Sequence, residues 1–303
     1  MPTRPLKCLR DPRACRSRLH PSLSTRAACA LLAPLLAASA AGCAHNYTSD
    51  IAPRYAGASR QALLRAANDT LRIASFNLQF GRNVPEALAL IRREPQLRDA
   101  DVLLLQEMDA RGTARIASEL GYAWVYYPAT RHPQTGRDFG NAVLSRLPIE
   151  SDRKVILPHL ARIGRTQRIA VGATLRWGDR PLRVYSLHLA TFTGNGPKAR
   201  RQQLEAVLAD ADSFAYVVVG GDFNSESLPK RAAAVGYGWP TKKLPPTNVA
   251  GTIDHLLTQG LVPADSTSVG VIPKIRDISD HKPIWARLVA RERDTALLRT
   301  GTR

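Results

Sequence analysis

Acidic, amide and imidazole side chains follow several apolar segments of this chain. In VVVGGDFNS, at Val217–Ser225, three branched apolar residues and two glycines precede Asp222 and Asn224. Positions i and i+2 of an extended segment point the same way, so these two side chains would project together from the end of a sheet. Turn chemistry is the ordinary explanation, because Asp and Asn in loops often bond their own backbone. Other segments of the chain decide between the two.

The same arrangement recurs in five other segments. Asn77 ends SFN, Glu107 ends LLLQE, His188 comes late in YSLHLA, Asp254 and His255 interrupt TIDHLL, and Asp280 and His281 precede PIWARLV. A carboxylate can hold a hard cation or accept a proton, and histidine titrates near neutral pH. One such residue carries little weight. Six separate segments suggest convergence at one end of a sheet pair, where loops build sites on a rigid scaffold.

The hydrophobic pattern supplies the elements that would position these side chains. From residue 71 onward, strand-like segments alternate with a few helical ones. The expected helices are Gln61–Ala67, Pro85–Leu97, Thr113–Leu120 and Lys198–Asp210. Ten or more strands with three or four helices predict an α+β fold of two stacked sheets. We expect one domain over residues 70–290, followed by a loose basic tail at 291–303.

Seven stretches of the chain resemble the endonuclease/exonuclease/phosphatase family, which includes deoxyribonuclease I, abasic-site endonucleases, neutral sphingomyelinases and inositol-phosphate phosphatases. In order they are SFNLQ, LLLQE, GNAVLSRLPI, SLHL, GGDFN, TIDHLL and SDHKPIWA, spanning residues 75–286. GDFN with a later SDHKP is specific, so function is favoured over turn chemistry. The resemblance implies a four-layered α/β/β/α sandwich of two packed mixed sheets with helices outside. It also implies divalent-metal-dependent hydrolysis of phosphate esters.

The resemblance further implies a role for each matching residue. The metal side would consist of Glu107 as the main Mg²⁺ ligand, Asn77 on the metal or the phosphate, and Asp280 at or near the metal; Mn²⁺ is an alternative ion. The catalytic side would consist of Asp222 acting on the attacking water, Asn224 on a phosphate oxygen or the Asp222 carboxylate, His188 on the phosphate, and Asp254 fixing a protonated His281.

Three further positions are less specific. Arg168 fits the place where the family has an Arg or Tyr that contacts the phosphate, although Arg162 and Arg165 lie close by. Asn141 is a further candidate, but strand packing explains it equally well. His255 is expected to be structural, because it points to the face opposite Asp254.

The expected function is therefore a metal-dependent phosphodiesterase. The loops at residues 131–140 and 236–250 mix basic and aromatic residues, which favours a nucleic-acid substrate. A phospholipid, sphingolipid or inositol phosphate is the alternative substrate. The alternative from another class is a catalytically silent binding lipoprotein on the same fold, but all eight of the matching polar residues are present.

The start of the chain predicts export. The formal net charge is +18, and the first 42 residues contain seven Lys/Arg and one Asp. The rest then has 36 basic and 24 acidic residues, a net charge of about +12, which favours anionic partners. A basic segment precedes the apolar run AACALLAPLLAASAAG at 27–42, the order of an export signal.

The end of this run, AAGC, resembles a bacterial lipobox with Cys43 as the lipidated residue. All four cysteines lie in the first 43 residues, so no disulfide framework is expected in the folded part. We expect a signal peptide at 1–42, the lipidated Cys43 and a tether at 43–69, and a monomer anchored by lipid to a membrane, the outer membrane facing the periplasm. A secreted or periplasmic protein with an ordinary signal-peptidase site is the alternative.

Overall fold

In the central strands, successive apolar side chains point to opposite faces of the sheet and so belong to different cores. In the strand Val102–Met108 (β4), Val102 and Leu104 lie in a core between two sheets, whereas Leu103 and Leu105 belong to a second core beneath helices. This is the period-two pattern of a strand that is buried on both faces. The computed structural model describes residues 45–59, 69–133 and 135–291, which all belong to the unit Cys43–Arg303.

The first sheet contains nine strands of the described chain. Its main order is β1-β5-β6-β4-β3-β14-β12, with β13 paired to β14 and β2 to β5. The bounds are His45–Asn46 (β1), Tyr55–Gly57 (β2), Thr70–Asn77 (β3), Ala123–Arg131 (β5), Asp138–Ser145 (β6), Leu261–Pro263 (β12), Val269–Val271 (β13) and Ile284–Ala290 (β14). Because β3 and β4 are parallel, their carboxyl ends meet at one edge of the sheet.

The second sheet has the order β11-β10-β9-β8-β7. Its strands are Ile149–Ile156 (β7), Ile169–Trp177 (β8), Arg180–His188 (β9), Tyr216–Asp222 (β10) and Asp254–Gln259 (β11). The parallel pair β9 and β10 again brings two carboxyl ends together. The antiparallel partner β11 places its first residue beside the last residue of β10.

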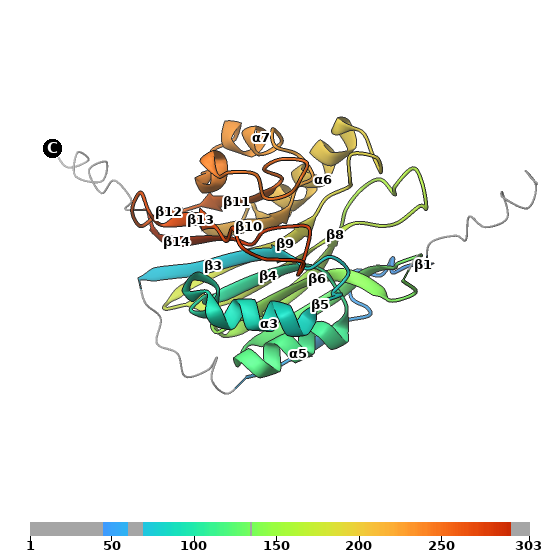
Figure 1. The fold of residues 1–303 in the computed structure, drawn as a ribbon. Helices are drawn as coiled ribbons and strands as arrows, with labels where there is room; N and C mark the ends of the chain where they lie inside the picture. Colours follow the sequence, from blue (N-terminus) through green and yellow to red (C-terminus); the bar gives the residue numbers. More distant parts are fainter. Residues whose placement is uncertain (1–44, 60–68, 134, 292–303) are drawn as a thin grey trace, which may run out of the picture. The chain divides into compact units, whose positions relative to one another are not determined.

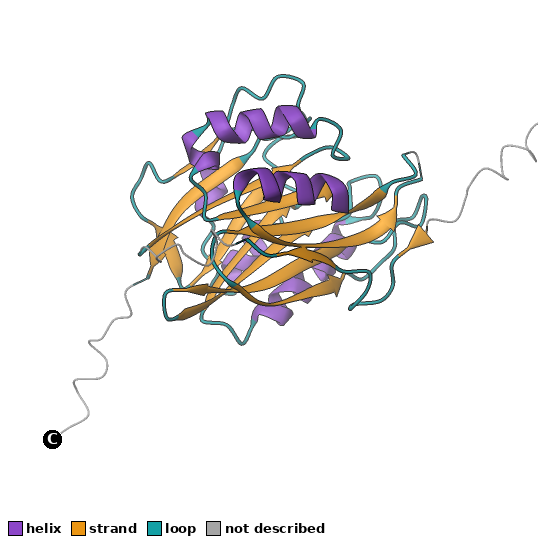
Figure 2. Cartoon of the chain, turned by 90° about the horizontal axis from the view of Figure 1, so that it is seen from below, coloured by secondary structure: helices purple, strands orange, loops and turns teal. Residues whose placement is uncertain are grey.

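Helices cover the outer face of each sheet (Figures 1 and 2). On the first sheet they are α3 (Val84–Arg93), α4 (Pro95–Arg98) and α5 (Ala110–Leu120); on the second they are α6 (Pro197–Ala211) and α7 (Pro229–Ala234). The 3-10 helix η1 (Pro240–Lys243) lies along the edge strand β11, where Thr241 bonds the Leu256 backbone. Three apolar cores separate the resulting layers. The expected four-layered α/β/β/α sandwich is confirmed.

Several expected boundaries were wrong for local reasons. The predicted helix Pro85–Leu97 is two helices, because Glu94 caps α3 in an extended conformation immediately before Pro95. Helix α5 starts three residues earlier than predicted, where the Asp109 side chain accepts a hydrogen bond from the Gly112 N–H. The family-like stretch GNAVLSRLPI contributes to two strands, since β6 ends at Ser145 and the chain crosses to the other sheet to begin β7.

The expected tether is partly built into the first sheet. Strands β1 and β2 both pair with β5, and the Tyr47 hydroxyl donates to Asp138 at 2.6 Å. Arg54 forms an ion pair with Asp152 on β7 at 2.6 Å. Residues 45–59 therefore belong to the folded unit, which begins earlier than the predicted boundary at residue 70.

Some predictions concern residues outside the described ranges. These are the signal peptide at 1–42, lipidation at Cys43, the helix at Gln61–Ala67 and the tail beyond residue 291. Among the residues that are described, no helix is long and apolar enough to cross a membrane.

Candidate active site

The predicted site residues meet because of how the strands pair. Asn77 is the last residue of β3 and lies beside Gln106, which immediately precedes Glu107 in β4. In the other sheet, Asp222 at the end of β10 is in register with His188 on one side and Asp254 on the other. Parallel pairing of β3 with β4 and of β9 with β10, together with antiparallel pairing of β10 with β11, thus brings five separate segments to one end of the sandwich.

Two glycines let the VVVGGDFNS strand reach this position. A Cβ on Gly220 would lie 2.6 Å from a methyl group of Leu104 and from one of Leu256, so glycine permits the close approach of the sheets. Gly221 has a φ of +146°, and a Cβ there would collide with the Leu187 carbonyl oxygen. The glycines therefore serve to place Asp222, and they do more than end the strand.

Glu107, Asn77 and Asp222 form the hydrogen-bonded centre of the site. The Asn77 Nδ2 group donates to Glu107 Oε1 and to Asp222 Oδ2, both at 3.2 Å. The Phe80 N–H donates to Glu107 Oε2 at 3.0 Å. Glu107 has a φ of +59° where the pairing of β4 with β6 shifts register, a backbone distortion common at functional sites.

Burial governs the charge of these two carboxyl groups. Desolvation raises the pKa of Glu107, against the opposing effect of Arg168. It raises the pKa of Asp222 to about 7, although the charge of His281 opposes this. Both carboxylates are therefore ionised at a cost, which a cation in contact with them would relieve.

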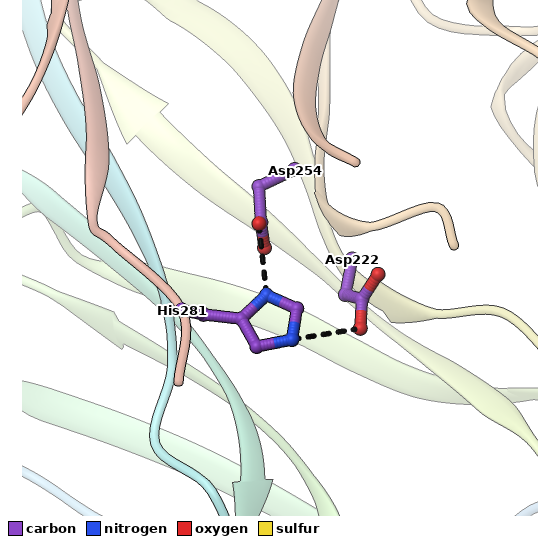
Figure 3. A group of neighbouring side chains, drawn as sticks. All are labelled: Asp222, Asp254 and His281. Carbon is purple, nitrogen blue, oxygen red and sulfur yellow. Dashed lines mark hydrogen bonds and ion pairs between the residues drawn. The ribbon is translucent and has the colours of Figure 1, made fainter. Parts of the chain in front are cut away.

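His281 and Asp254 form a buried charged pair. His281 Nδ1 is 2.8 Å from Asp254 Oδ2, and Nε2 is 3.7 Å from Asp222 Oδ2 (Figure 3). Burial alone would lower the pKa of His281, but the carboxylates of Asp254, Asp222 and Asp280 raise it to about 10. The predicted contact between Asp254 and His281 is present.

His188 lies on the opposite side of Asp222 in a different environment. Its Nε2 is 3.3 Å from Asp222 Oδ2, but an Arg168 guanidinium nitrogen lies 2.9 Å from each of its ring nitrogens. Burial and the charge of Arg168 hold the pKa of His188 well below 6.5. The imidazole is therefore neutral beside a permanent cation.

One predicted side chain, that of Asn224, is placed differently from the expectation. Asn224 does not project beside Asp222, because the chain leaves the strand and Asn224 adopts a φ of +49°. Its backbone N–H donates to Asp222 Oδ1 at 2.8 Å, and its side chain donates to the Leu189 carbonyl at 3.1 Å. Asn224 thus orients Asp222 through its backbone. Asp280 is exposed, and it acts on Glu107 and His281 by charge.

Two other polar residues are structural. The Asn141 amide is buried and donates to the carbonyls of Ile169 and Ser186, which links β6 of the first sheet to the second sheet. His255 lies between Phe223 and Trp239 and receives a hydrogen bond from Trp239 Nε1 at 3.2 Å. The expectation that His255 is structural agrees with this packing.

The site also depends on hydroxyl groups that the sequence pattern did not identify. Ser279 Oγ donates to the Asn77 carbonyl at 2.7 Å and accepts from the His281 N–H at 3.1 Å. Thr247 Oγ1 accepts from the N–H groups of Ile253 and Asp254 at 3.1 and 3.2 Å. Ser279 stands in the SDHKP motif and could have been found there, whereas no pattern marks Thr247.

The donor atoms suit a hard divalent cation. Asp222, Asp254 and His281 offer ligand atoms within 4.8 Å of one another. Asp254 and His281 already bind each other, so the oxygens of Glu107 and Asn77 are the atoms of this site that could hold a cation. Carboxylate and amide oxygens are the ligands that Mg²⁺ prefers, usually with one or two carboxylates and several waters.

A cavity of about 540 Å³ opens beside this centre, with Glu107 and Arg168 in its lining. Three aromatic rings form one wall: the ring centre of His132 lies 4.6 Å from that of Phe80 and 5.4 Å from that of Phe139. The Arg82 guanidinium lies 4.9 Å from the centre of the Phe80 ring. The polar centre therefore continues into a surface that combines aromatic rings with positive charge.

Comparison with known proteins agrees with this architecture. No match is found among curated proteins. Among solved structures, an endonuclease/exonuclease/phosphatase from Beutenbergia cavernae is 20% identical and has a TM-score of 0.60, with 73% of this chain and 72% of that chain covered. The human Nocturnin catalytic domain with bound sulfate is 20% identical and has a TM-score of 0.56, with 81% and 100% covered.

Zebrafish (D. rerio) TDP2 complexed with a single-strand DNA product is 15% identical and has a TM-score of 0.59, with 73% of this chain and 99% of that chain covered. These low identities establish the shared fold. The family is established separately, because the model of the Endonuclease/Exonuclease/phosphatase family matches residues 74–281, more than half of the sequence. The chain belongs to the endonuclease/exonuclease/phosphatase family.

Proposed function

We propose that this protein is a divalent-metal-dependent phosphodiesterase that cleaves nucleic acid. The observation that carries the proposal is the connection of Asn77, Glu107 and Asp222 to the Asp254–His281 pair at one end of the sandwich. Hydrolysis of a phosphodiester requires a positioned water, a base and positive charge around the phosphoryl oxygens. These residues can supply all three.

Asp222 is suited to take the proton from the attacking water. Its pKa of about 7 makes it a base matched to neutral pH. The Asn224 N–H and the Asn77 side chain hold its two oxygens, at 2.8 and 3.2 Å. The carboxylate is thus fixed in direction before substrate binds.

Positive charge on both sides of Asp222 would stabilise the phosphoryl oxygens. His281 carries its second proton at Nε2, and Arg168 lies on the far side beside His188. A neutral His188 can still donate one N–H to a phosphate oxygen. Bound to Glu107 and Asn77, Mg²⁺ would add Lewis-acid stabilisation of the same oxygens.

The aromatic wall is the reason to favour nucleic acid. Bases stack on aromatic side chains, and a positive groove follows the phosphate backbone. The wall includes His132 and Phe139 from the loop at 131–140, which supports the expectation for that loop. In the other expected loop, the half-buried Trp239 bonds His255. A phospholipid head group is the second candidate, because the exposed Ile163 also lines the cavity.

A substrate panel tests the proposal. Duplex DNA, single-stranded DNA, RNA, sphingomyelin, phosphatidylinositol and bis-p-nitrophenyl phosphate would each be assayed with Mg²⁺ and with EDTA. We expect metal-dependent cleavage, most rapid on a nucleic acid. Glu107→Gln should lose on the order of 10²-fold activity, because it removes the charge that holds the metal. The exposed control Glu205→Gln should keep wild-type activity. Full activity in EDTA would contradict the metal-dependent mechanism.

We also propose that the protein is an exported monomer tethered by a lipid on Cys43 to the outer membrane, facing the periplasm. The lipobox-like AAGC supports this placement. Cys43→Ala should abolish fatty-acid labelling and release the protein from membranes, whereas Cys29→Ala should change neither. Labelling that persists in Cys43→Ala would show that the lipid is elsewhere. Light scattering of the released protein should give the mass of one chain.

A further inference from the structure

Two loops beside the cavity present large apolar side chains to solvent. Ile163 lies in the loop between β7 and β8, and Phe192 lies in the loop between β9 and α6; each side chain is 81% exposed. Thr191 and Thr193, on either side of Phe192, line the same cavity as Ile163. Both apolar tips therefore border the entrance to the candidate active site.

The two loops are built to hold these tips in place. They bond directly, with the Arg162 N–H donating to the Gly194 carbonyl at 2.9 Å. Arg200 of α6 is buried and donates to the carbonyls of Asn195 at 2.9 Å and of Thr191 at 3.3 Å. A buried cation that supports a loop backbone indicates an ordered feature, and exposed apolar side chains on an ordered rim suggest a contact surface.

The charged side chains on these two loops are all basic. Arg162, Arg165 and Lys198 are exposed on the same two loops and the start of α6. Residues 154–178 and 189–204 contain no Asp or Glu. Apolar tips surrounded by basic residues fit a surface that is apolar inside and anionic outside.

The start of the folded chain lies at the same place. The Asn46 side chain donates to the Arg165 carbonyl and accepts from the Gln167 N–H, both at 2.8 Å. In Figure 1, β1 and the β7–β8 loop lie at the same end of the sandwich. Cys43 precedes His45 by two positions in the sequence.

We propose that the β7–β8 and β9–α6 loops form a membrane-docking surface, in which Ile163 and Phe192 insert among the lipids and Arg162, Arg165 and Lys198 bind anionic head groups. The proposal uses the tethered placement suggested above and does not depend on the reaction. A lipid on Cys43 would bring this surface to the bilayer, and docking would turn the cavity entrance toward it. Isoleucine offers no flat ring on which a base could stack, which favours lipid over nucleic acid here.

A fluorophore at the tip tests the insertion directly. The full chain with its four cysteines changed to serine would carry Phe192→Cys labelled with an environment-sensitive dye. Adding vesicles of phosphatidylglycerol and phosphatidylethanolamine should shift its emission to the blue and brighten it several-fold. Lipids with brominated acyl chains should quench it. The control is Val235→Cys, an exposed apolar site next to α7 that is not in the cavity lining, where we expect no change.

Replacing the basic residues of the docking surface tests whether they bind anionic head groups. Arg162→Gln, Arg165→Gln and Lys198→Gln together should weaken vesicle binding about fivefold for each charge, since each basic residue contributes to binding an anionic bilayer. Arg92→Gln, Arg93→Gln and Arg111→Gln on α3 and α5 form the matched control and should have little effect. Circular dichroism would verify that every variant is folded.

The outcomes separate this proposal from the others. No emission change at position 192, or an equal change at position 235, would overturn it. A change produced by single-stranded DNA and not by vesicles would also overturn it and assign the loops to nucleic acid. Glu107→Gln should lower hydrolysis on the order of 10²-fold and leave the emission change intact, so failure of the enzyme proposal and failure of docking are distinguishable.

Discussion

The two histidines of the site lie on either side of Asp222 and differ in charge: His281 is protonated and His188 is neutral. His281 binds Asp254 through Nδ1 at 2.8 Å and faces Asp222 through Nε2, so its pKa rises to about 10. His188 approaches the same carboxylate at 3.3 Å but lies against Arg168, and its pKa falls well below 6.5. Burial lowers the pKa of both imidazoles, but carboxylates, Asp254 first among them, raise that of His281, whereas Arg168 lowers that of His188 further.

This difference would give the two histidines separate roles at one bound phosphate. On the His281 side the charge sits on an imidazole that a carboxylate stabilises. On the His188 side the charge sits on Arg168, which stays protonated at any working pH, and the imidazole can act only as a neutral donor. We therefore expect the His281 side to be sensitive to pH and the His188 side to be insensitive.

Removing the charged pair should have the largest effect. His281→Ala should lower the rate about 10³-fold and Asp254→Asn about 10²-fold, because both remove stabilisation of developing charge. Residues that act as one unit are not additive, so the double variant should be little worse than His281→Ala. His159→Ala, at an exposed histidine, is the control. Strict additivity of the two losses would show that Asp254 is only a structural turn residue.

Removing Arg168, the cation on the His188 side, should lower the rate less, about tenfold, since His188 and the metal would continue to contact the phosphate. Arg168→Gln should also raise the pKa of His188, because the guanidinium is one of the causes that lower it. NMR titration of the imidazole checks this directly. Arg165→Gln, a nearby exposed charge, should leave the titration unchanged. A His188 pKa that stays low in Arg168→Gln would mean that burial alone sets it.

The pH profile sharpens the contrast further. If His281 must be protonated, activity of the free enzyme is lost as pH rises through its pKa of about 10. Asp254→Asn removes the carboxylate that raises this pKa, so the alkaline limb of kcat/KM should move by about one pH unit or more toward neutrality. Arg168→Gln should leave that limb in place. An alkaline limb that does not move in Asp254→Asn would contradict a protonated His281.

The smallest effect concerns stability. The pKa of Asp222 is raised from 3.8 to about 7, so the protonated form favours folding. Its contribution is complete below pH 3.8 and is lost as pH rises through about 7. Asp222→Asn cannot ionise, so without metal it should be more stable than the wild type at pH 8, on the order of 1 kcal/mol, with no gain at pH 4. Urea unfolding in EDTA at both pH values measures this. A loss of stability at pH 8 would show that Asp222 is favourably ionised.

The sequence by itself determined the fold class and most of the site. Strand-like runs that end in Asn77, Glu107, His188 and Asp222 predicted convergence, because parallel strands bring their carboxyl ends to one edge. The resemblance to the family supplied the expected pairing of Asp254 with His281. These features are local, so they can be read from short stretches of the chain.

Only the tertiary structure decided what surrounds each side chain. The i and i+2 rule failed at Asn224, because the chain turns into a left-handed conformation after Asp222. The segment expected as a tether pairs with β5, which no short pattern could predict from residues so far apart in sequence. The charges of His188 and His281 depend on partners from other strands and on burial. Protonation is set by desolvation and by charges brought close in space, and neither is present in the chain before it folds.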